Sequence, residues 1–275
     1  MAENAGAVAV VNCDFFNNDE NAHPDAPHTN APVGPVIMGG QDIKAAVPDK
    51  QRMGPARDDL VYPGSPDFPA NQTVLGITTA GEATITELSL DGSLQTRSGE
   101  FTLDGLNQYA IPEGGIGAFT SEWGTGPRLR AICGDEGARN GPCSDSILEI
   151  TVADDIVTEA TVIDECCEAS SDPVDAGEVV FVARDAAADE LADVAVGDPL
   201  YWDHDLVAPD GAEFTTAIGG YPLVIDGRGL PGVDPGDRRP RTIAGHDKDG
   251  TTLFLAVVEE ATLTEGSWRI RTLHR

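Results

Sequence analysis

The sequence predicts a strand-rich α+β fold, in which mixed and antiparallel sheets are built from hairpins and helices are few. The chain is rich in glycine (31) and proline (19) but only 5% aromatic, a composition typical of short strands joined by tight turns. From residue 74 onward, alternating apolar runs are separated by dipeptides that favour turns. A length of 275 residues allows one large domain or two small ones, and we expect a single domain over residues 1–275.

The first predicted element is a short buried strand at residues 9–11, Ala-Val-Val. It runs into the polar residues Asn12, Cys13 and Asp14 before two phenylalanines follow. A strand end that presents polar groups is either a turn or the rim of a site.

A polar loop rich in Asn, Pro and His follows at residues 17–35. A loop of this length inside a compact domain is more often functional than incidental. Residues 36–46 then predict two short strands around a Gly39-Gly40 turn.

Hairpins dominate the rest of the chain, and one helix is expected. The helix covers residues 184–197, where Leu191 and Val194 have helical spacing and Gly197 provides a stop. The predicted hairpin turns are Asp91-Gly92, Asp154-Asp155, Asp226-Gly227 and Asp249-Gly250.

The net charge is −30, from 47 acidic and 17 basic residues, so the surface repels phosphates and nucleic-acid binding is not expected. Either the acidic surface keeps the protein soluble in a salty or extracellular setting, or it forms a face that binds polyvalent cations. Residues 247–259 lack the spacing of an EF-hand loop and predict a hairpin turn. We expect no cofactor, although a divalent cation remains open.

No stretch approaches 18 apolar residues, so we expect no membrane span. The first 12 residues lack a basic region and do not form a signal peptide. The sequence leaves the oligomeric state open.

Five cysteines suggest at least one disulfide. Cys133 and Cys143 bracket a Gly-rich loop whose ends can close, so we predict a bond between them. Cys166 and Cys167 are vicinal and cannot easily bond each other, and their pairing and that of Cys13 stay open. Zinc is a weaker alternative because there is no CxxC and no histidine at ligand spacing. Disulfides would indicate an oxidising compartment.

Three stretches combine glycines or polar groups with a neighbouring strand, and each has a structural alternative. The first is the turn at residues 12–14. Gly219 and Gly220 either allow a ligand to approach the backbone or mark a β-bulge. The arginine cluster at residues 238–241 either binds a carboxylate or phosphate, or forms salt bridges with the surplus acidic groups.

Five motifs occur in an order that resembles the phosphodiester glycosidase family. They are AVAVVNCDFF (7–16), DGLN (104–107), GIGAFTSEWGTGPR (115–128), AIGGYPLV (217–224) and RRPRTIAGHDKDGTTLFLAVVE (238–259). The family includes N-acetylglucosamine-1-phosphodiester α-N-acetylglucosaminidases and many secreted bacterial proteins. The resemblance covers residues 5–259 and implies a hydrolase that cleaves a sugar 1-phosphodiester in a glycan or glycolipid. It also implies an extracellular or cell-envelope location.

Two departures from the family pattern qualify this expectation. Cys13 stands where the family usually has Gly or Ala. The family's later segment, with its Asn-Leu-Asp-Gly-Gly-Gly-Ser-type motif, has no counterpart in the atypical tail at residues 260–275. We therefore expect a chain truncated at both ends relative to the family, weakly active or inactive alone, and marginally folded at residues 253–275.

A sugar 1-phosphodiester departs as a phosphate monoester, so the reaction needs its developing negative charge stabilised. The resemblance implies that Asp14 activates water or attacks the anomeric carbon, and that Asn12 holds a sugar or phosphate oxygen. Arg241, Arg239 and Thr242 would bind the phosphate end of the substrate. Gly219 and Gly220, which lack side chains, would leave room for the substrate. Trp123 would either stack on a sugar ring or pack in the core. We expect these stretches, Trp123 apart, to converge on one cleft. Retention or inversion stays open, and the alternative is a non-catalytic carbohydrate- or cell-surface-binding module.

Overall fold

A computed structural model describes most of the chain and confirms a strand-rich fold with very few helices. The described residues are 11–18, 21–53, 70–135, 138–163, 173–225, 228–229 and 238–262. None of the helices in these ranges has the length or apolar character needed to cross a bilayer.

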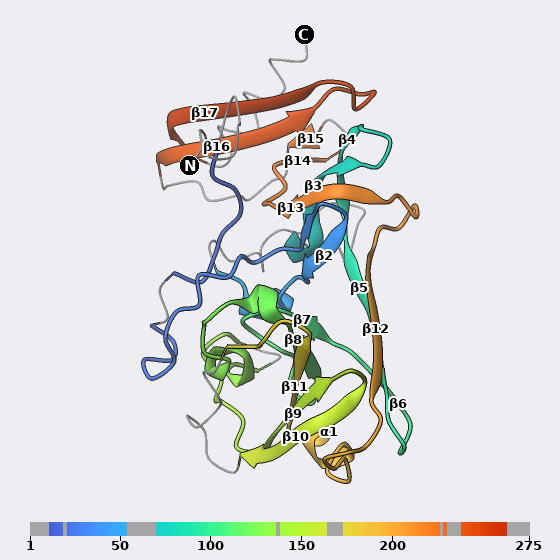
Figure 1. Cartoon of the computed structure of the whole chain (residues 1–275). Helices are drawn as coiled ribbons and strands as arrows, with labels where there is room; N and C mark the ends of the chain where they lie inside the picture. The colour runs from blue at the N-terminus through green and yellow to red at the C-terminus, as the bar shows by residue number, and fades with distance from the viewer. Residues whose placement is uncertain are drawn as a thin grey trace.

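The first five-stranded sheet lies in the upper half of Figure 1 and has the order β2-β1-β13-β3-β4. All of its neighbouring strands are antiparallel. It joins distant parts of the chain, because β13 pairs with β1 on one side and with β3 on the other. Its strands are β1 (Val36–Met38), β2 (Gln41–Lys44), β3 (Thr73–Thr78), β4 (Ala83–Glu87) and β13 (Phe214–Gly219).

The second five-stranded sheet lies in the lower half and has the order β10-β9-β11-β8-β7. It is mixed, because β7 runs parallel to β8 while the other pairs are antiparallel. Its strands are β7 (Gly105–Leu106), β8 (Ile116–Phe119), β9 (Ile147–Ala153), β10 (Ile156–Ile163) and β11 (Glu178–Arg184).

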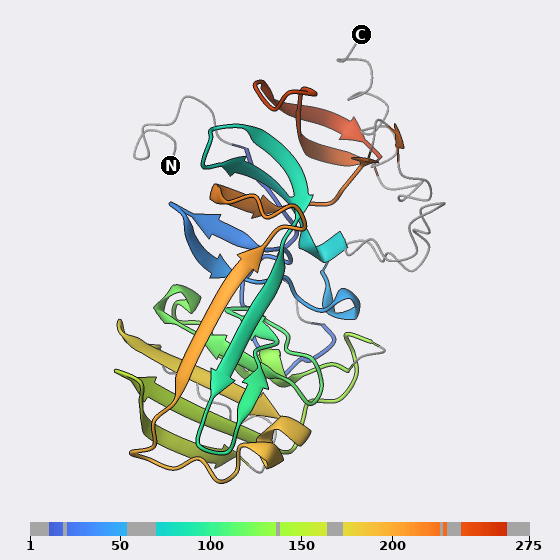
Figure 2. The same ribbon diagram turned by 90° about the vertical axis from the view of Figure 1, so that its right-hand side faces the viewer.

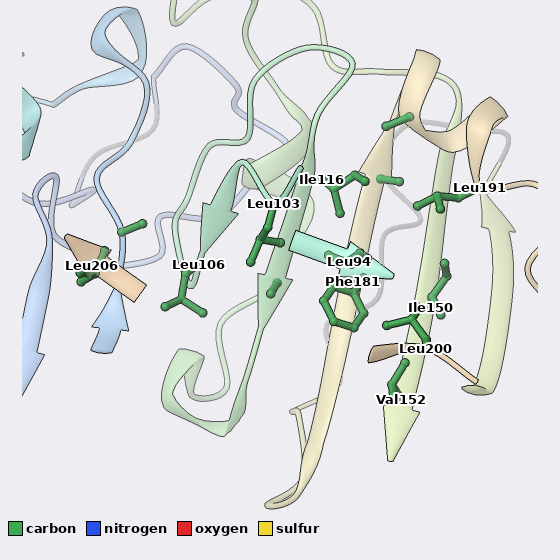
Figure 3. Packing of buried hydrophobic residues seen from close by; sticks show 14 of the residues in the cluster. Leu94, Leu103, Leu106, Ile116, Ile150, Val152, Phe181, Leu191, Leu200 and Leu206 are labelled. Atoms are coloured by element: carbon green, nitrogen blue, oxygen red, sulfur yellow. The ribbon is translucent and has the colours of Figure 1, made fainter. Parts of the chain in front are cut away.

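A three-stranded ribbon runs between the two halves, as Figure 2 shows. It consists of β12 (Tyr201–Val207), β5 (Ser89–Gln95) and β6 (Glu100–Thr102), in that order. Leu94 of β5 packs with Phe181 and Ile150 of the second sheet (Figure 3). The same buried cluster includes Ile37 and Val74 of the first sheet, so one continuous core joins both sheets.

Two further hairpins follow the last strand of the first sheet. They are β14 (Val224–Ile225) with β15 (Arg228–Gly229), and β16 (Arg239–His246) with β17 (Leu253–Ala261). The second hairpin agrees with the predicted turn at Asp249-Gly250, whereas Asp226-Gly227, the turn predicted for the first, lies outside the described residues. The turns at Gly39-Gly40 and Asp154-Asp155 are also confirmed, and all four of these residues have positive φ. Aspartate tolerates this conformation better than most non-glycine residues.

The hairpin predicted around Asp91-Gly92 is wrong. These residues lie inside the continuous strand β5, and the break between strands falls at the fully buried Leu88. A Cβ atom at Gly92 would lie 3.1 Å from the Leu103 side chain and 3.3 Å from the Asp203 carbonyl oxygen. The glycine therefore permits close packing rather than a turn.

The helix predicted at residues 184–197 is much shorter than expected. Only α1 (Ala186–Glu190) is α-helical, and turns follow it. Leu191 and Val194 are buried as their spacing suggested, but Leu191 has already left helical geometry at φ −96° and ψ 3°. Four 3₁₀ turns complete the helical content of the described ranges, at Asp49–Gln51, Ala70–Gln72, Ser121–Trp123 and Leu129–Ile132.

The structure describes only part of the predicted opening strand and of the C-terminal tail. Val11 is not in a strand, and the rest of the predicted opening strand lies outside the described residues. Of the atypical tail, the described residues 260–262 include the end of β17. Residues 263–275 lie outside the described ranges.

Candidate functional site

A large cleft lies between the first sheet, the β16–β17 hairpin and the segment at residues 11–18, with a volume of about 1670 Å³. The three predicted stretches all reach it, although the first is more than 200 residues from the other two in sequence. The predicted site residues that line the cleft are Asn12, Asp14, Gly219, Gly220, Arg239, Arg241 and Thr242. The fold therefore gathers every predicted substrate or catalytic residue except Trp123.

The carboxylate of Asp14 is fixed by the backbone. Its Oδ1 accepts the N–H of Phe15 at 2.7 Å and its Oδ2 accepts the N–H of Gly34 at 2.6 Å. The residue has a φ of 22°, a sparsely populated conformation for a side chain larger than glycine. Burial raises the pKa of Asp14, while these two hydrogen bonds and the charges of Lys44 and Arg52 oppose the rise.

Two glycines make room for this carboxylate. A Cβ atom on Gly219 would lie 2.5 Å from the Asp14 Oδ2 and 2.7 Å from the Gly34 Cα atom. A Cβ atom on Gly34 would meet the Gly219 Cα atom at 2.7 Å. Gly219 is thus required for close packing of backbone and carboxylate, whereas a Cβ atom on Gly220 would meet nothing within 4 Å.

Lys44 is a fully buried cation behind Asp14, and sequence reasoning did not select it. Its Nζ donates hydrogen bonds to the carbonyl oxygens of Val33 and Gly34, each at 3.3 Å, and of Ala45 at 2.5 Å. Burial lowers the pKa of Lys44 to about 7, and the Asp14 charge opposes this shift. The sequence feature that could have identified Lys44 is its place in a predicted strand, in a chain with only 17 basic residues.

Arg52 is a second cation that the sequence did not reveal. Its guanidinium carbon lies 4.8 Å from the ring centroid of Tyr221 and 5.9 Å from that of Phe15, and both aromatic residues line the cleft. Burial lowers the pKa of Arg52, opposed by the nearby Tyr221 and Asp14. No local pattern indicates these neighbours, because the three segments meet only in the folded chain.

The β16 hairpin carries the predicted arginines to the opposite wall. Arg241 is partly buried and donates from Nε to the Ala261 carbonyl oxygen at 3.2 Å, whereas Arg239 is exposed. The hydroxyl of Thr242 donates to the side-chain oxygen of Asn12. This contact links two predicted site segments directly.

His246 anchors the same hairpin to the first sheet. The Ile85 N–H of β4 donates to His246 Nε2 at 3.1 Å. The other ring nitrogen, Nδ1, lies 2.7 Å from the Asp247 carbonyl oxygen and donates to it. A neutral imidazole in one tautomer therefore holds β16 against the edge of β4.

Trp123 does not lie with the residues that line the cleft. Its indole packs edge to face on Phe119, with ring centroids 5.0 Å apart, and its N–H donates to the Gly126 carbonyl oxygen at 2.7 Å. Its placement matches the core alternative rather than a sugar platform.

The predicted disulfide between Cys133 and Cys143 is confirmed. Cys13 is a free thiol that lines the cleft and is partly open to solvent, and the partial burial that remains, together with the charge of Asp14, raises its pKa. A raised pKa favours the neutral thiol, which is a weak nucleophile. Cys166 and Cys167 lie outside the described residues.

Two solved structures have a similar fold. One is the "Crystal structure of a hypothetical protein from Synechocystis", with a TM-score of 0.67 and 19% identity over 99% of this chain and 45% of that chain. The other is a "Putative exported protein (BPSS2145) from Burkholderia pseudomallei K96243", with a TM-score of 0.64 and 17% identity over 99% of this chain and 59% of that chain.

At these identities the similarity shows the fold alone. This chain spans about half the length of the solved chains that it resembles. No protein-family model matches the sequence, and no curated protein matches it.

Proposed function

We propose that the cleft binds a sugar 1-phosphodiester and that the protein hydrolyses it. The observation that carries this proposal is the cleft itself, which is lined by a partly buried carboxylate, Asp14, and by two arginines of β16. A phosphodiester glycosidase needs both groups, one for the anomeric carbon and one for the departing phosphate. The sequence resemblance supplies the reaction class.

In this proposal Arg241 and Arg239 bind the phosphate. Charge grows on the phosphate as the glycosidic bond breaks, so a guanidinium that pairs with two oxygens stabilises the transition state more than the substrate. Asn12, joined to Thr242, orients a sugar or phosphate oxygen.

Asp14 provides the carboxylate that activates water or attacks the sugar. The raised pKa makes it a stronger base than an ordinary aspartate, while Lys44 and Arg52 help to keep it ionised. Its two backbone hydrogen bonds fix the orientation of the carboxylate before substrate arrives.

A second candidate is a non-catalytic module that binds an anionic carbohydrate in the same cleft. One observation favours it: both oxygens of Asp14 already accept backbone hydrogen bonds. In this second candidate the Asp14 carboxylate orders the cleft wall and takes no part in a reaction.

The test is release of phosphate monoester from an N-acetylglucosamine 1-phosphodiester by the whole chain. In a complete, active version of the protein, Arg241→Lys is expected to lower kcat far more than it raises KM. The matched control is Arg238→Lys, because Arg238 is exposed and does not line the cleft. Equal turnover by the two variants would remove Arg241 from the mechanism, and saturable binding of the diester without turnover would favour the binding module.

We also propose that the protein acts outside the cell or in the cell envelope. The disulfide is typical of an oxidising compartment. A structural neighbour that carries the words "exported protein" in its name is consistent with this location.

A further inference from the structure

A histidine that does not line the cleft, His23, lies beside the disulfide. The Nδ1 of His23 is 3.7 Å from the Sγ of Cys143, and one ligand atom from each of His23, Cys133 and Cys143 lies within 4.8 Å of the others. In a tetrahedral zinc site with bonds of about 2.0 Å to nitrogen and 2.3 Å to sulfur, the N···S separation is about 3.5 Å. The separation between His23 Nδ1 and Cys143 Sγ is therefore close to that of two ligands of one zinc ion.

The second ring nitrogen fixes the tautomer that a metal requires. Nε2 of His23 lies 2.8 Å from the Arg139 carbonyl oxygen. A carbonyl can only accept, so Nε2 carries the hydrogen and Nδ1 presents a lone pair to the sulfur. A histidine that ligates a metal usually donates its other N–H to such a carbonyl.

Hydrogen bonds on both sides of the disulfide keep the two cysteines opposite each other without the S–S bond. The Gly134 N–H donates to the Pro142 carbonyl oxygen at 3.1 Å, and the Ser144 N–H donates to that of Ile132 at 3.0 Å. The buried Arg130 guanidinium also donates to the Cys133 carbonyl oxygen at 2.8 Å. We expect the sulfurs to stay close together after reduction, because this backbone frame does not depend on their bond.

We propose that reduction of the Cys133–Cys143 disulfide opens a binding site for a soft divalent cation such as Zn²⁺. A dithiol or phosphine supplies two electrons, the S–S bond breaks, and two protons complete the thiols. Binding of Zn²⁺ then releases both protons, and the ion takes two thiolates and the neutral Nδ1 of His23. This leaves a fourth position for water or an added ligand.

The oxidation state of the Cys133–Cys143 pair controls whether the site can bind a metal ion. Sulfur in a disulfide carries no charge and is a poor ligand, so the oxidised protein offers a single imidazole to the ion. The sequence disfavoured zinc because no histidine stood near the cysteines, yet the fold brings His23 to them across 120 residues. The proposal is independent of any activity in the cleft.

The experiment uses the whole chain with Cys13, Cys166 and Cys167 replaced by serine, so that only the proposed pair supplies thiols. Co²⁺ is added to the oxidised protein and to the protein reduced with a phosphine that is then removed. The reduced protein is expected to bind one Co²⁺ with thiolate charge-transfer absorption and the intense visible bands of tetrahedral cobalt. Zn²⁺ should displace it, and the oxidised protein should show neither signal.

His23→Ala is expected to weaken Zn²⁺ binding to the reduced protein by about tenfold or more. The matched control is His28→Ala, an exposed histidine in the same loop, which should bind within about twofold of the parent. Thermal unfolding of the reduced protein with and without Zn²⁺ checks the fold, and Zn²⁺ should raise the Tm only after reduction. Absence of the cobalt signal in the reduced protein, or equal affinities for the two histidine variants, would overturn the proposal.

Discussion

Asp14 brings together most of the chemistry of the cleft at the scale of single residues. It has an unusual backbone conformation, two backbone hydrogen bonds, and two buried or partly buried cations as neighbours. Gly34 and Gly219 pack against it so closely that neither tolerates a side chain without movement. Because so many contacts constrain Asp14, we infer that the cleft wall around it is rigid. Substitutions at Gly219 and Lys44 test this.

Gly219→Ala should destabilise the protein by roughly 1–3 kcal/mol, because the new methyl group overlaps the Asp14 carboxylate and the Gly34 backbone. Gly220→Ala is the matched control and should change the free energy of unfolding little, since its Cβ atom meets nothing within 4 Å. Denaturant unfolding of both variants measures the difference. Equal stabilities would show that the close approach at Gly219 does not constrain the wall.

Lys44 should make stability depend on pH above neutrality. Its pKa is about 7 in the folded protein and near the ordinary 10.5 when unfolded, so between these values the unfolded chain binds more protons. Stability should therefore rise as pH increases from about 7 to about 10, by up to about 1.4 kcal/mol per pH unit from this group.

Lys44→Met should flatten that rise, while Lys50→Met, at an exposed lysine, should leave it unchanged. Urea unfolding at several pH values compares the slopes of the three proteins. A slope that survives in Lys44→Met would show that Lys44 keeps its proton throughout this range.

At the scale of elements, the β16–β17 hairpin forms one wall of the cleft and carries its arginines. It is a separate two-stranded sheet, and β16 lies against β4. Two backbone-directed contacts hold it there: His246 accepts from Ile85, and the Gly250 carbonyl oxygen accepts from Ala83 at 2.8 Å. The position of Arg241 over the cleft therefore depends on one side-chain contact and one backbone contact rather than on a continuous sheet.

His246→Ala should loosen this junction without unfolding the protein. The Ile85 amide loses its acceptor, so its hydrogen exchange should become roughly tenfold faster, the equivalent of about one hydrogen bond. Asp249→Ala, in the turn of the same hairpin, serves as the control and should leave that exchange rate unchanged. The Tm should move little in both variants, because the affected amide is at an exposed edge. Unchanged exchange in His246→Ala would mean that packing alone holds the hairpin.

At the scale of the whole molecule, the dominant property is a net charge of −30. Excess charge of one sign opposes the compact state through repulsion. The buried cluster that joins the two sheets and the connecting ribbon, together with two further buried clusters, must hold the described part of the chain together against this repulsion.

Salt should therefore stabilise the protein. Raising NaCl from about 0.01 M to about 0.15 M shortens the screening length from about 30 Å to about 8 Å and should raise the free energy of unfolding. A variant with four exposed acids changed to amides, Asp91→Asn, Glu122→Gln, Glu190→Gln and Asp193→Asn, should respond less. Denaturant unfolding at each salt concentration measures the two slopes.

Unfolding measured over a range of salt concentrations also separates the two explanations of the acidic surface, solubility and binding of polyvalent cations. If the charge serves solubility, CaCl₂ at matched ionic strength should act much like NaCl. A saturable extra stabilisation by Ca²⁺ would instead support a face that binds polyvalent cations. Identical salt slopes for the parent and the four-site variant would contradict the repulsion argument.

The sequence by itself determined the strand-rich class, the turns at Gly39-Gly40 and Asp154-Asp155, the β16–β17 hairpin and the disulfide. Each of these depends on a few neighbouring residues, because turn conformation and short-loop closure are local properties of the chain. The error at Asp91-Gly92 has the same origin: a local turn signal was outweighed by packing against Leu103 and β12, which no local window contains.

Only the tertiary structure decided which groups surround the polar residues. β13 lies between β1 and β3, and this pairing places Gly219 against Asp14 from across the chain. Lys44 and Arg52 became neighbours of Asp14, and His23 of the disulfide, in the same way. The sequence specifies a side chain's chemistry, but its pKa and its partners depend on burial and on distant segments, and these exist only once the chain has folded.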